Sequence, residues 1–144
     1  MLENKPLFYL DDDADDLEIF LQVATSLGIE TKLFDRGDKL LKTLLNPPPK
    51  PSLIFVDLNM PLISGFEIMK QIKSNDFLTG IPVIAFSTAN DLNTVEKCKK
   101  LGADYYITKP SQFNQLKNAL QIVININWEE HDRAKNFYHK FSSI

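Results

Sequence analysis

The 144-residue sequence has one cysteine, no long apolar run and no excess of basic charge. Because Cys98 has no second cysteine to pair with, an intrachain disulfide is impossible and a cysteine-rich zinc site is excluded. The first apolar run, residues 6–10, is too short for a signal peptide or a membrane span. We therefore expect a cytoplasmic protein in a reducing compartment, with no membrane partner.

The charge balance also argues against binding to DNA. The formal net charge is −3, whereas a nucleic-acid face needs clustered lysine and arginine side chains to displace counterions. Lys97, Lys99 and Lys100 do cluster, but they come late in a helical pattern, where basic side chains interact favourably with the helix dipole. With 44% hydrophobic residues, the chain can form one compact domain with a substantial core.

Apolar runs of strand length alternate five times with stretches of helical periodicity. This alternation is typical of βαβ units and predicts an α/β fold with a parallel sheet. The predicted strands are residues 6–10, 31–34, 53–56, 82–86 and 104–108, and the predicted helices are about 15–27, 38–45, 65–72, 92–101 and one from 111 onward. The third run is continuously apolar, as expected of a central strand covered on both faces.

Two segments lie outside this alternation. The proline-rich residues 47–51 predict a stiff surface connector, with a ligand for another protein module as the alternative. Residues 126–144 carry Ala134, Phe137, Tyr138 and Phe141 at helical spacing, which predicts a C-terminal helical extension too short for a separate effector domain. This tail could extend the last helix, fold back over the domain, or present aromatic side chains to a partner. We expect its two histidines, 131 and 139, to be surface residues.

Polar residues follow four of the predicted strands. The chain places Asp11, Asp12 and Asp13 after the first strand, and Asp57, Ser87 and Lys109 after the third, fourth and fifth. Because the carboxyl ends of parallel strands meet at one edge of the sheet, we expect these side chains to form one site.

The chemistry indicated by these residues is phosphoryl transfer. Adjacent carboxylates repel one another unless a cation compensates, and an all-oxygen site of this kind is what Mg²⁺ prefers. Asp57, at the end of the central strand, is the candidate nucleophile for an aspartyl phosphate. Lys109 and Ser87 are candidates to bind the phosphoryl oxygens.

The spacing of these residues resembles the receiver domain of two-component response regulators. The likeness rests on Asp11-Asp12, on Asp57-Leu58-Asn59-Met60-Pro61 with Gly65 and Phe66, on Ser87, and on Lys109-Pro110, and it covers about residues 5–124. It implies a flavodoxin-like, doubly wound, five-stranded parallel sheet of order 2-1-3-4-5 with five helices. The implied receiver domain is residues 1–125, followed by the extension 126–144.

The resemblance also implies a role for each site residue. Asp57 would accept a phosphoryl group from a sensor histidine kinase or a phosphotransfer protein, so that the chain would catalyse no reaction other than its own phosphorylation and dephosphorylation. The implied Mg²⁺ ligands, which Mn²⁺ could share, are Asp12, Asp57 and the carbonyl of Asn59, with Asp11 acting through water. Ser87, Lys109 and Tyr106 would bind the phosphoryl group or switch with it, while Pro61, Gly65 and Pro110 would shape the loops.

Such a protein would act on a downstream protein partner. A homodimer could form through the face made by the fourth helix, fifth strand and fifth helix, or through the C-terminal tail. Asp15 and Asp16, by contrast, are interpreted as residues of a helix first turn, where the dipole favours acidic side chains.

Two alternatives compete with this interpretation. Asp11 and Asp13 also resemble the nucleophile and acid of haloacid dehalogenase-type phosphatases, but that family needs a later acidic metal-binding pair at a strand end. After Lys109 the acidic residues of the chain are only Glu129, Glu130 and Asp132, which lie in the predicted helical tail and not at a strand end. The other alternative is a receiver-like module that binds partners without phosphorylation, which is disfavoured because the proposed acceptor, metal and phosphoryl-binding residues are all retained.

Overall fold

The computed structural model describes residues 5–139 and alternates strands with helices along the chain. The strands are β1 (Leu7–Leu10), β2 (Thr31–Phe34), β3 (Leu53–Asp57), β4 (Val83–Ser87), β5 (Tyr105–Thr108) and β6 (Tyr138–His139). The helices are α1 (Ala14–Ser26), α2 (Gly37–Leu44), α3 (Gly65–Lys73), α4 (Leu92–Lys100) and α5 (Phe113–Ile124). The five strands and five helices predicted from the alternation are therefore confirmed, with small differences at their ends.

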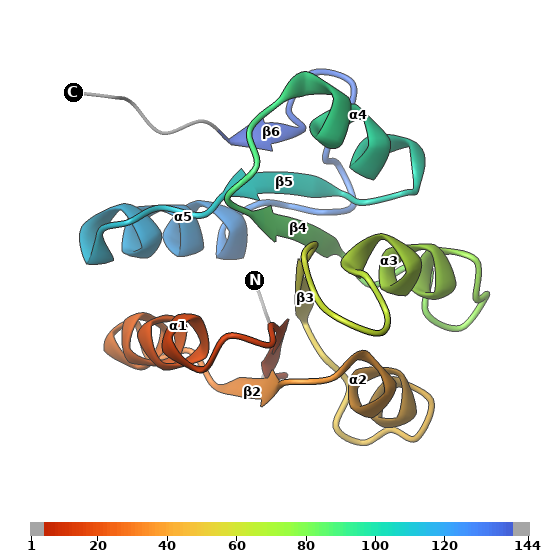
Figure 1. The fold of residues 1–144 in the computed structure, drawn as a ribbon, viewed down its shortest axis with the longest axis horizontal. Coiled ribbons are helices and arrows are strands. Elements are labelled where there is room, and N and C mark those ends of the chain that lie inside the picture. The colour runs from red at the N-terminus through yellow and green to blue at the C-terminus, as the bar shows by residue number, and fades with distance from the viewer. Residues whose placement is uncertain (1–4, 140–144) are drawn as a thin grey trace.

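The strands form one parallel sheet in the order β2-β1-β3-β4-β5-β6. Helices α1 and α5 cover one face, and α2, α3 and α4 cover the other (Figure 1). The doubly wound fold and the order of the first five strands agree with the prediction. The predicted number of strands was wrong, because β6 adds a sixth strand beside β5. Within residues 5–139, no helix is long and apolar enough to cross a membrane.

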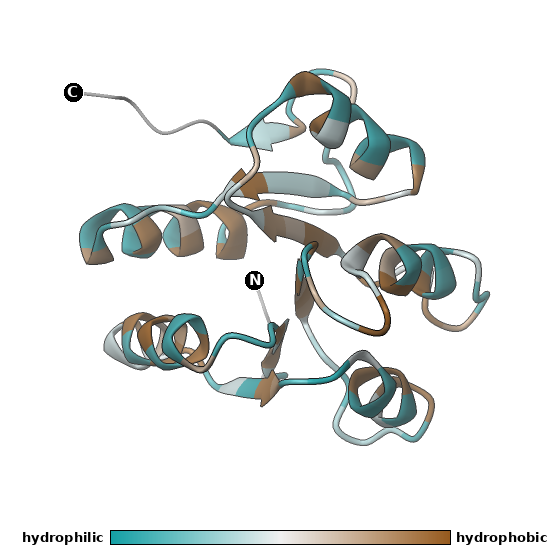
Figure 2. Cartoon of the chain, in the orientation of Figure 1, coloured by the Kyte–Doolittle hydropathy of each residue, from teal (hydrophilic) through white to brown (hydrophobic). Residues whose placement is uncertain are grey.

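Alternating side chains of the strands supply two apolar cores, one under each layer of helices. Leu7 and Tyr9 of β1 pack in the core beneath α1 and α5, whereas Phe8 and Leu10 pack in the core beneath the other three helices. This division follows from the two-residue repeat of a strand. In Figure 2 the inner strands β3 and β4 are largely brown, whereas the helices carry teal on their outer sides. The central strand β3 is buried along its whole length.

The C-terminal segment differs from the prediction. From Ile126 to Asn136 the chain has turns and no helix, and Tyr138–His139 then pairs with β5 in register with Tyr106 and Ile107. The predicted helix is therefore wrong for the described part of the tail, and Phe141 lies outside it. Without this segment β5 would be an edge strand with unpaired backbone amides. Pairing with β6 gives these amides hydrogen-bond partners, and the same arrangement buries the Phe137 side chain. Of the three arrangements that the sequence left open for the tail, the structure has the one in which the tail folds back over the domain.

The proline-rich connector joins α2 to β3, and residues 46–50 are exposed. The prediction of a surface loop is therefore confirmed. It lies at the amino ends of the strands, on the opposite edge of the sheet from the polar strand ends.

Candidate functional site

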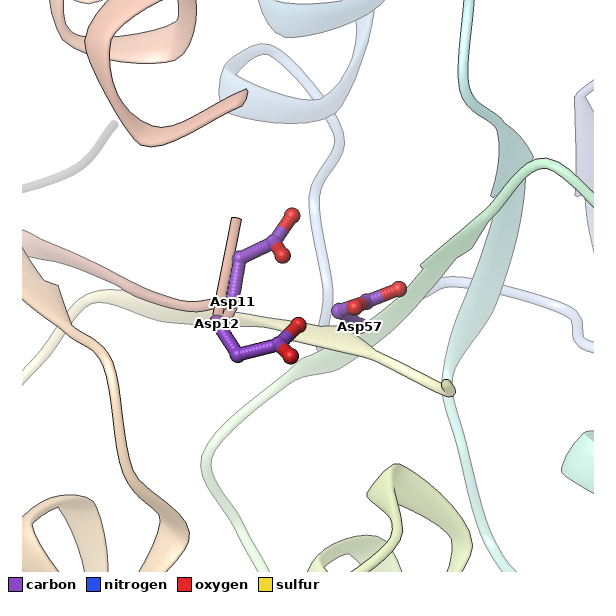
Figure 3. Close-up of side chains that lie close together, drawn as sticks. All are labelled: Asp11, Asp12 and Asp57. Carbon is purple, nitrogen blue, oxygen red and sulfur yellow. The ribbon is translucent and has the colours of Figure 1, made fainter. Parts of the chain in front are cut away.

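Three carboxylates meet where β1 and β3 end. Because these strands are neighbours with Leu10 in register with Val56, the residues that follow, Asp11 and Asp57, are also neighbours. Ligand oxygens of Asp11, Asp12 and Asp57 all lie within 4.8 Å of one another (Figure 3). Asp11 is fully buried and Asp57 is 5% exposed, whereas Asp12 is exposed to solvent. The strand ends thus meet as the sequence predicted.

The environment of Asp57 disfavours its charge. Burial raises the pKa of Asp57 to about 6, the nearby Asp11 carboxylate adds to this rise, and Lys109 opposes it. A group of carboxylates that repel one another and offer only oxygen atoms matches the ligand preference of Mg²⁺. The residues present therefore fit a divalent cation, with one carboxylate open to water for its entry.

Lys109 is the cation that the structure provides. Its Nζ lies 2.7 Å from Asp11 Oδ2, 2.9 Å from Asp16 Oδ2 and 3.3 Å from Asp57 Oδ1. Burial disfavours the ammonium, but hydrogen bonds to Asp11 and Asp16 outweigh this effect and raise the pKa of Lys109 above its ordinary value. The ammonium therefore stays charged beside the candidate acceptor.

Tyr9 holds the Asp11 carboxylate in place from the apolar core. Its hydroxyl donates a hydrogen bond to Asp11 Oδ2, the same oxygen that Lys109 contacts. Burial and the adjacent Asp11 carboxylate raise the pKa of Tyr9 far above its ordinary value, so the phenol remains a donor at every physiological pH. The second Asp11 oxygen accepts from the backbone N–H of Asp13 at 3.0 Å. The buried charge of Asp11 is therefore fully hydrogen-bonded.

Asp13 has a structural role at the start of α1. Its Oδ1 accepts from the backbone N–H groups of Asp15 at 2.8 Å and Asp16 at 3.2 Å, as expected of a helix N-cap. This hydrogen bonding occupies the carboxylate that the dehalogenase-type alternative would need as an acid. It also fixes the first turn of α1 so that Asp16 can reach Lys109.

Ser87 and Tyr106 are linked through the loop that follows β4. Ser87 is buried, and its hydroxyl accepts from the backbone N–H of Ala89 at 3.1 Å. Tyr106 is also fully buried, and its hydroxyl donates to the backbone oxygen of Ala89 at 2.6 Å. Burial raises the pKa of Tyr106 to about 12, while a hydrogen bond with Ser87 opposes this rise.

Gly65 allows a close approach of the backbone to Asp57. A β-carbon at this position would lie 2.0 Å from the carbonyl oxygen of Asp57, so no side chain fits there without moving the backbone. Pro61 and Asp12 line the same hollow, and the loop from Pro61 to Gly65 turns through Leu62, which has a φ of 71°. The proposed roles of the Asn59 carbonyl and Pro110 stay predictions.

Two residues of the site were not predicted from the sequence. Asp16 was interpreted as a helix first-turn residue, yet it shares Lys109 with Asp11. Tyr9 was interpreted only as part of the first apolar strand, and its contact with Asp11 was missed. A signal was present for Tyr9, because a tyrosine two residues before a buried carboxylate points to the same side of its strand.

Comparison with known proteins then decides the family. The family model for the response regulator receiver domain matches residues 7–121 of the chain. The chain belongs to this family. Receiver domains are signalling domains of two-component systems and not classical enzymes. The prediction made from the spaced aspartate, serine and lysine motifs is thereby confirmed.

Curated relatives include plant and bacterial response regulators. The chain is 38% identical over 87 residues to the two-component response regulator-like APRR5 of Arabidopsis thaliana, covering 60% of this chain and 16% of that protein. It is 33% identical over 109 residues to the chemotaxis protein CheV1 of Helicobacter pylori, covering 74% and 34%. The chain therefore spans at most about a third of these two longer proteins. With the response regulator ORR5 of rice it shares 30% identity over 115 residues, covering 80% of this chain and 85% of that protein.

Solved structures share the fold. The phosphorylated cyanobacterial phytochrome response regulator RcpA matches with a TM-score of 0.77 and 24% identity, covering 90% of this chain and 97% of that one. The Mn²⁺-bound form of response regulator Rcp1 matches with a TM-score of 0.74 and 26% identity, covering 88% and 96%. These likenesses support the receiver fold over nearly all of the described residues.

Proposed function

We propose that this receiver accepts a phosphoryl group on Asp57 from the phosphohistidine of a sensor kinase or a phosphotransfer protein. The observation that carries the proposal is the position of Asp57, which lies beside two further carboxylates and 3.3 Å from the ammonium of Lys109. A nucleophile, a cation site and a phosphoryl-binding cation thus lie within a few ångströms of one another.

In the transfer, a carboxylate oxygen of Asp57 attacks phosphorus and forms the acyl phosphate. The bond between phosphorus and the donor nitrogen breaks, and its electron pair returns to the imidazole. Lys109 Nζ, 3.3 Å from Asp57 Oδ1, is within reach of an oxygen of the incoming phosphoryl group. The Ser87 hydroxyl would bind another of these oxygens.

Asp12, Asp57 and the carbonyl of Asn59 would hold Mg²⁺, or Mn²⁺ in its place, with Asp11 acting through a water molecule. The cation would supply charge neutralisation, so that the carboxylates remain ionised while a dianion approaches. The protein contributes the fixed spacing of its carboxylates and the exposed approach at Asp12. The same site would later admit the water that hydrolyses the acyl phosphate.

The proposed output is a shift in population between two conformations of the domain. Ser87 would move toward the phosphoryl group, and Tyr106 would occupy a buried position behind it. The surface formed by α4, β5 and α5, in which β6 covers the edge of β5, would then bind a downstream protein in the cytoplasm or form a homodimer. DNA and membranes have no part in this proposal.

Phosphorylation by a small donor tests the proposal directly. We expect incubation with acetyl phosphate and Mg²⁺ to add the mass of one phosphoryl group, and chelation of the metal to prevent this gain. Asp57→Asn should gain nothing, whereas Asp76→Asn, which alters an exposed aspartate beyond the end of α3, should behave as the wild type. Failure of the wild type to gain the mass would contradict the proposal, as would an equal gain by Asp57→Asn.

A further inference from the structure

The C-terminal segment contacts Tyr106 from the side opposite the site. The backbone N–H of Tyr106 donates to the carbonyl of Phe137 at 2.8 Å, and Tyr138 is its register partner in β6. The rings of Tyr106 and Tyr138 pack edge to face, with centroids 5.4 Å apart and planes at 83°. These contacts explain why Tyr106 is fully buried although β5 would otherwise lie at the edge of the sheet.

The segment is anchored to the domain at several points. Phe137 is 6% exposed and belongs to the core beneath α2, α3 and α4. The Arg133 guanidinium donates to the backbone oxygens of Lys99 and Ala103, the first of which lies in the last turn of α4. The hydroxyls of Tyr138 and Thr108 are 2.9 Å apart. The tail therefore packs as a defined part of the fold, on the face that includes α4 and β5.

Tyr106 connects this segment to the proposed phosphoryl site. Its hydroxyl end bonds the carbonyl of Ala89, and the N–H of Ala89 bonds the hydroxyl of Ser87. One path of direct contacts thus runs from Tyr138 through Tyr106 and Ala89 to Ser87. A change in the position of the Tyr106 ring would alter the contacts at both ends of this path.

We propose that residues 137–139 form an internal brace that holds Tyr106 in its buried position and thereby favours the phosphorylated state. The inference rests on the proposed function, which assigns the buried position of Tyr106 to that state. An outward movement of the Tyr106 ring would have to displace the Tyr138 ring, which the pairing of β5 with β6 holds beside it. Because coupling between two sites is reciprocal, phosphorylation should in turn tighten the brace.

The affinity for beryllofluoride, a phosphoryl mimic that binds with Mg²⁺, tests this coupling in the full chain. We expect Tyr138→Ala to weaken beryllofluoride binding about fivefold or more, the lower end of typical coupling between sites. Tyr138→Phe keeps the ring and removes the contact with the Thr108 hydroxyl, so its affinity should stay within about twofold of wild type. The affinity for Mg²⁺ alone should be the same in all three proteins, because neither variant alters a carboxylate of the site.

Hydrogen exchange provides an independent readout. Beryllofluoride should slow the exchange of the Tyr106 amide and of the amides of residues 137–139 in the wild type. The brace is contradicted if Tyr138→Ala, folded by circular dichroism, binds beryllofluoride as tightly as wild type, or if these amides exchange equally fast with and without the mimic. Either result leaves phosphorylation of Asp57 intact as a proposal, because that proposal is tested separately by the mass gain of the wild type and of Asp57→Asn with acetyl phosphate.

Discussion

The ammonium of Lys109 lies 2.9 Å from the carboxylate of Asp16, a shorter distance than the 3.3 Å that separates it from Asp57. Asp16 belongs to the first turn of α1, whereas Lys109 follows β5, so two distant parts of the sequence share this contact. Lys109 also bonds Asp11. The proposed phosphoryl-binding cation is thus divided among three carboxylates, and one of them has no assigned part in metal binding.

We expect Asp16→Asn to speed phosphorylation by acetyl phosphate. The change removes a negative charge that repels the donor and competes with the phosphoryl group for Lys109. A gain of about 0.5–1 kcal/mol, or roughly two- to fivefold in rate, follows for a partly exposed charge at this distance. The rate of mass gain at fixed Mg²⁺ measures it. Asp15→Asn, an exposed neighbour in the same helical turn, is the control and should change the rate little. A slower reaction in Asp16→Asn alone would show that Asp16 positions Lys109 productively.

The fold and most of the site followed from the sequence, because strands, helices and strand ends have local signatures. The apolar runs and their polar ends predicted where Asp11, Asp57 and Lys109 would meet. The contact between Asp16 and Lys109 could not be predicted, since it depends on the orientation of α1 over the sheet. For the same reason the spacing of Phe137 and Tyr138 suggested a helix, whereas the unpaired edge of β5, a feature of the assembled sheet, selects a strand.

The stability of the apo protein should depend on pH through Asp57. The pKa of this group rises from 3.8 to about 6 on folding, so the folded state binds its proton more tightly. Its stabilising contribution is present below about pH 4 and is lost as the pH rises through 6. With metal chelated, we expect Asp57→Asn to exceed the wild type in free energy of unfolding at pH 7.5 by about 2–3 kcal/mol.

Chemical denaturation at pH 7.5 and at pH 5 measures this difference, which should shrink at the lower pH. Addition of Mg²⁺ at pH 7.5 should stabilise the wild type more than Asp57→Asn, since the proposed ligand is absent from the variant. A difference that is the same at both pH values would show that ionisation of Asp57 carries no cost in the folded protein.

We expect Gly65→Ala to impair both folding and phosphorylation. The new methyl group would lie 2.0 Å from the Asp57 carbonyl oxygen, so the backbone that positions the acceptor must shift. A loss of about 1–3 kcal/mol in the free energy of unfolding is typical of such overpacking. Gly80→Ala is the matched control, because a β-carbon there meets no atom within 4 Å. That change should be neutral or stabilising by up to about 1 kcal/mol. Equal effects of the two substitutions would contradict the role of the close approach.

Leu62→Gly should stabilise the protein. Leu62 has φ of 71° and is 93% exposed, so its side chain strains the backbone and contributes little burial. Relief of about 1–2 kcal/mol, less the greater chain entropy of glycine, leaves a net gain of roughly 0.5–1 kcal/mol. Thermal unfolding measures this gain. Leu45→Gly, at an exposed leucine with φ of −84°, should instead lower the melting temperature. A lower melting temperature for Leu62→Gly would mean that the leucine makes a stabilising contact.

Chemical mapping of the phosphorylated residue tests the central claim most directly. Borohydride reduces an aspartyl phosphate to homoserine, which tandem mass spectrometry of peptides locates. After treatment with acetyl phosphate and Mg²⁺, we predict homoserine at position 57 and at none of the neighbouring aspartates, Asp11, Asp12, Asp13 and Asp16. Homoserine at one of those positions, with Asp57 unmodified, would contradict the account.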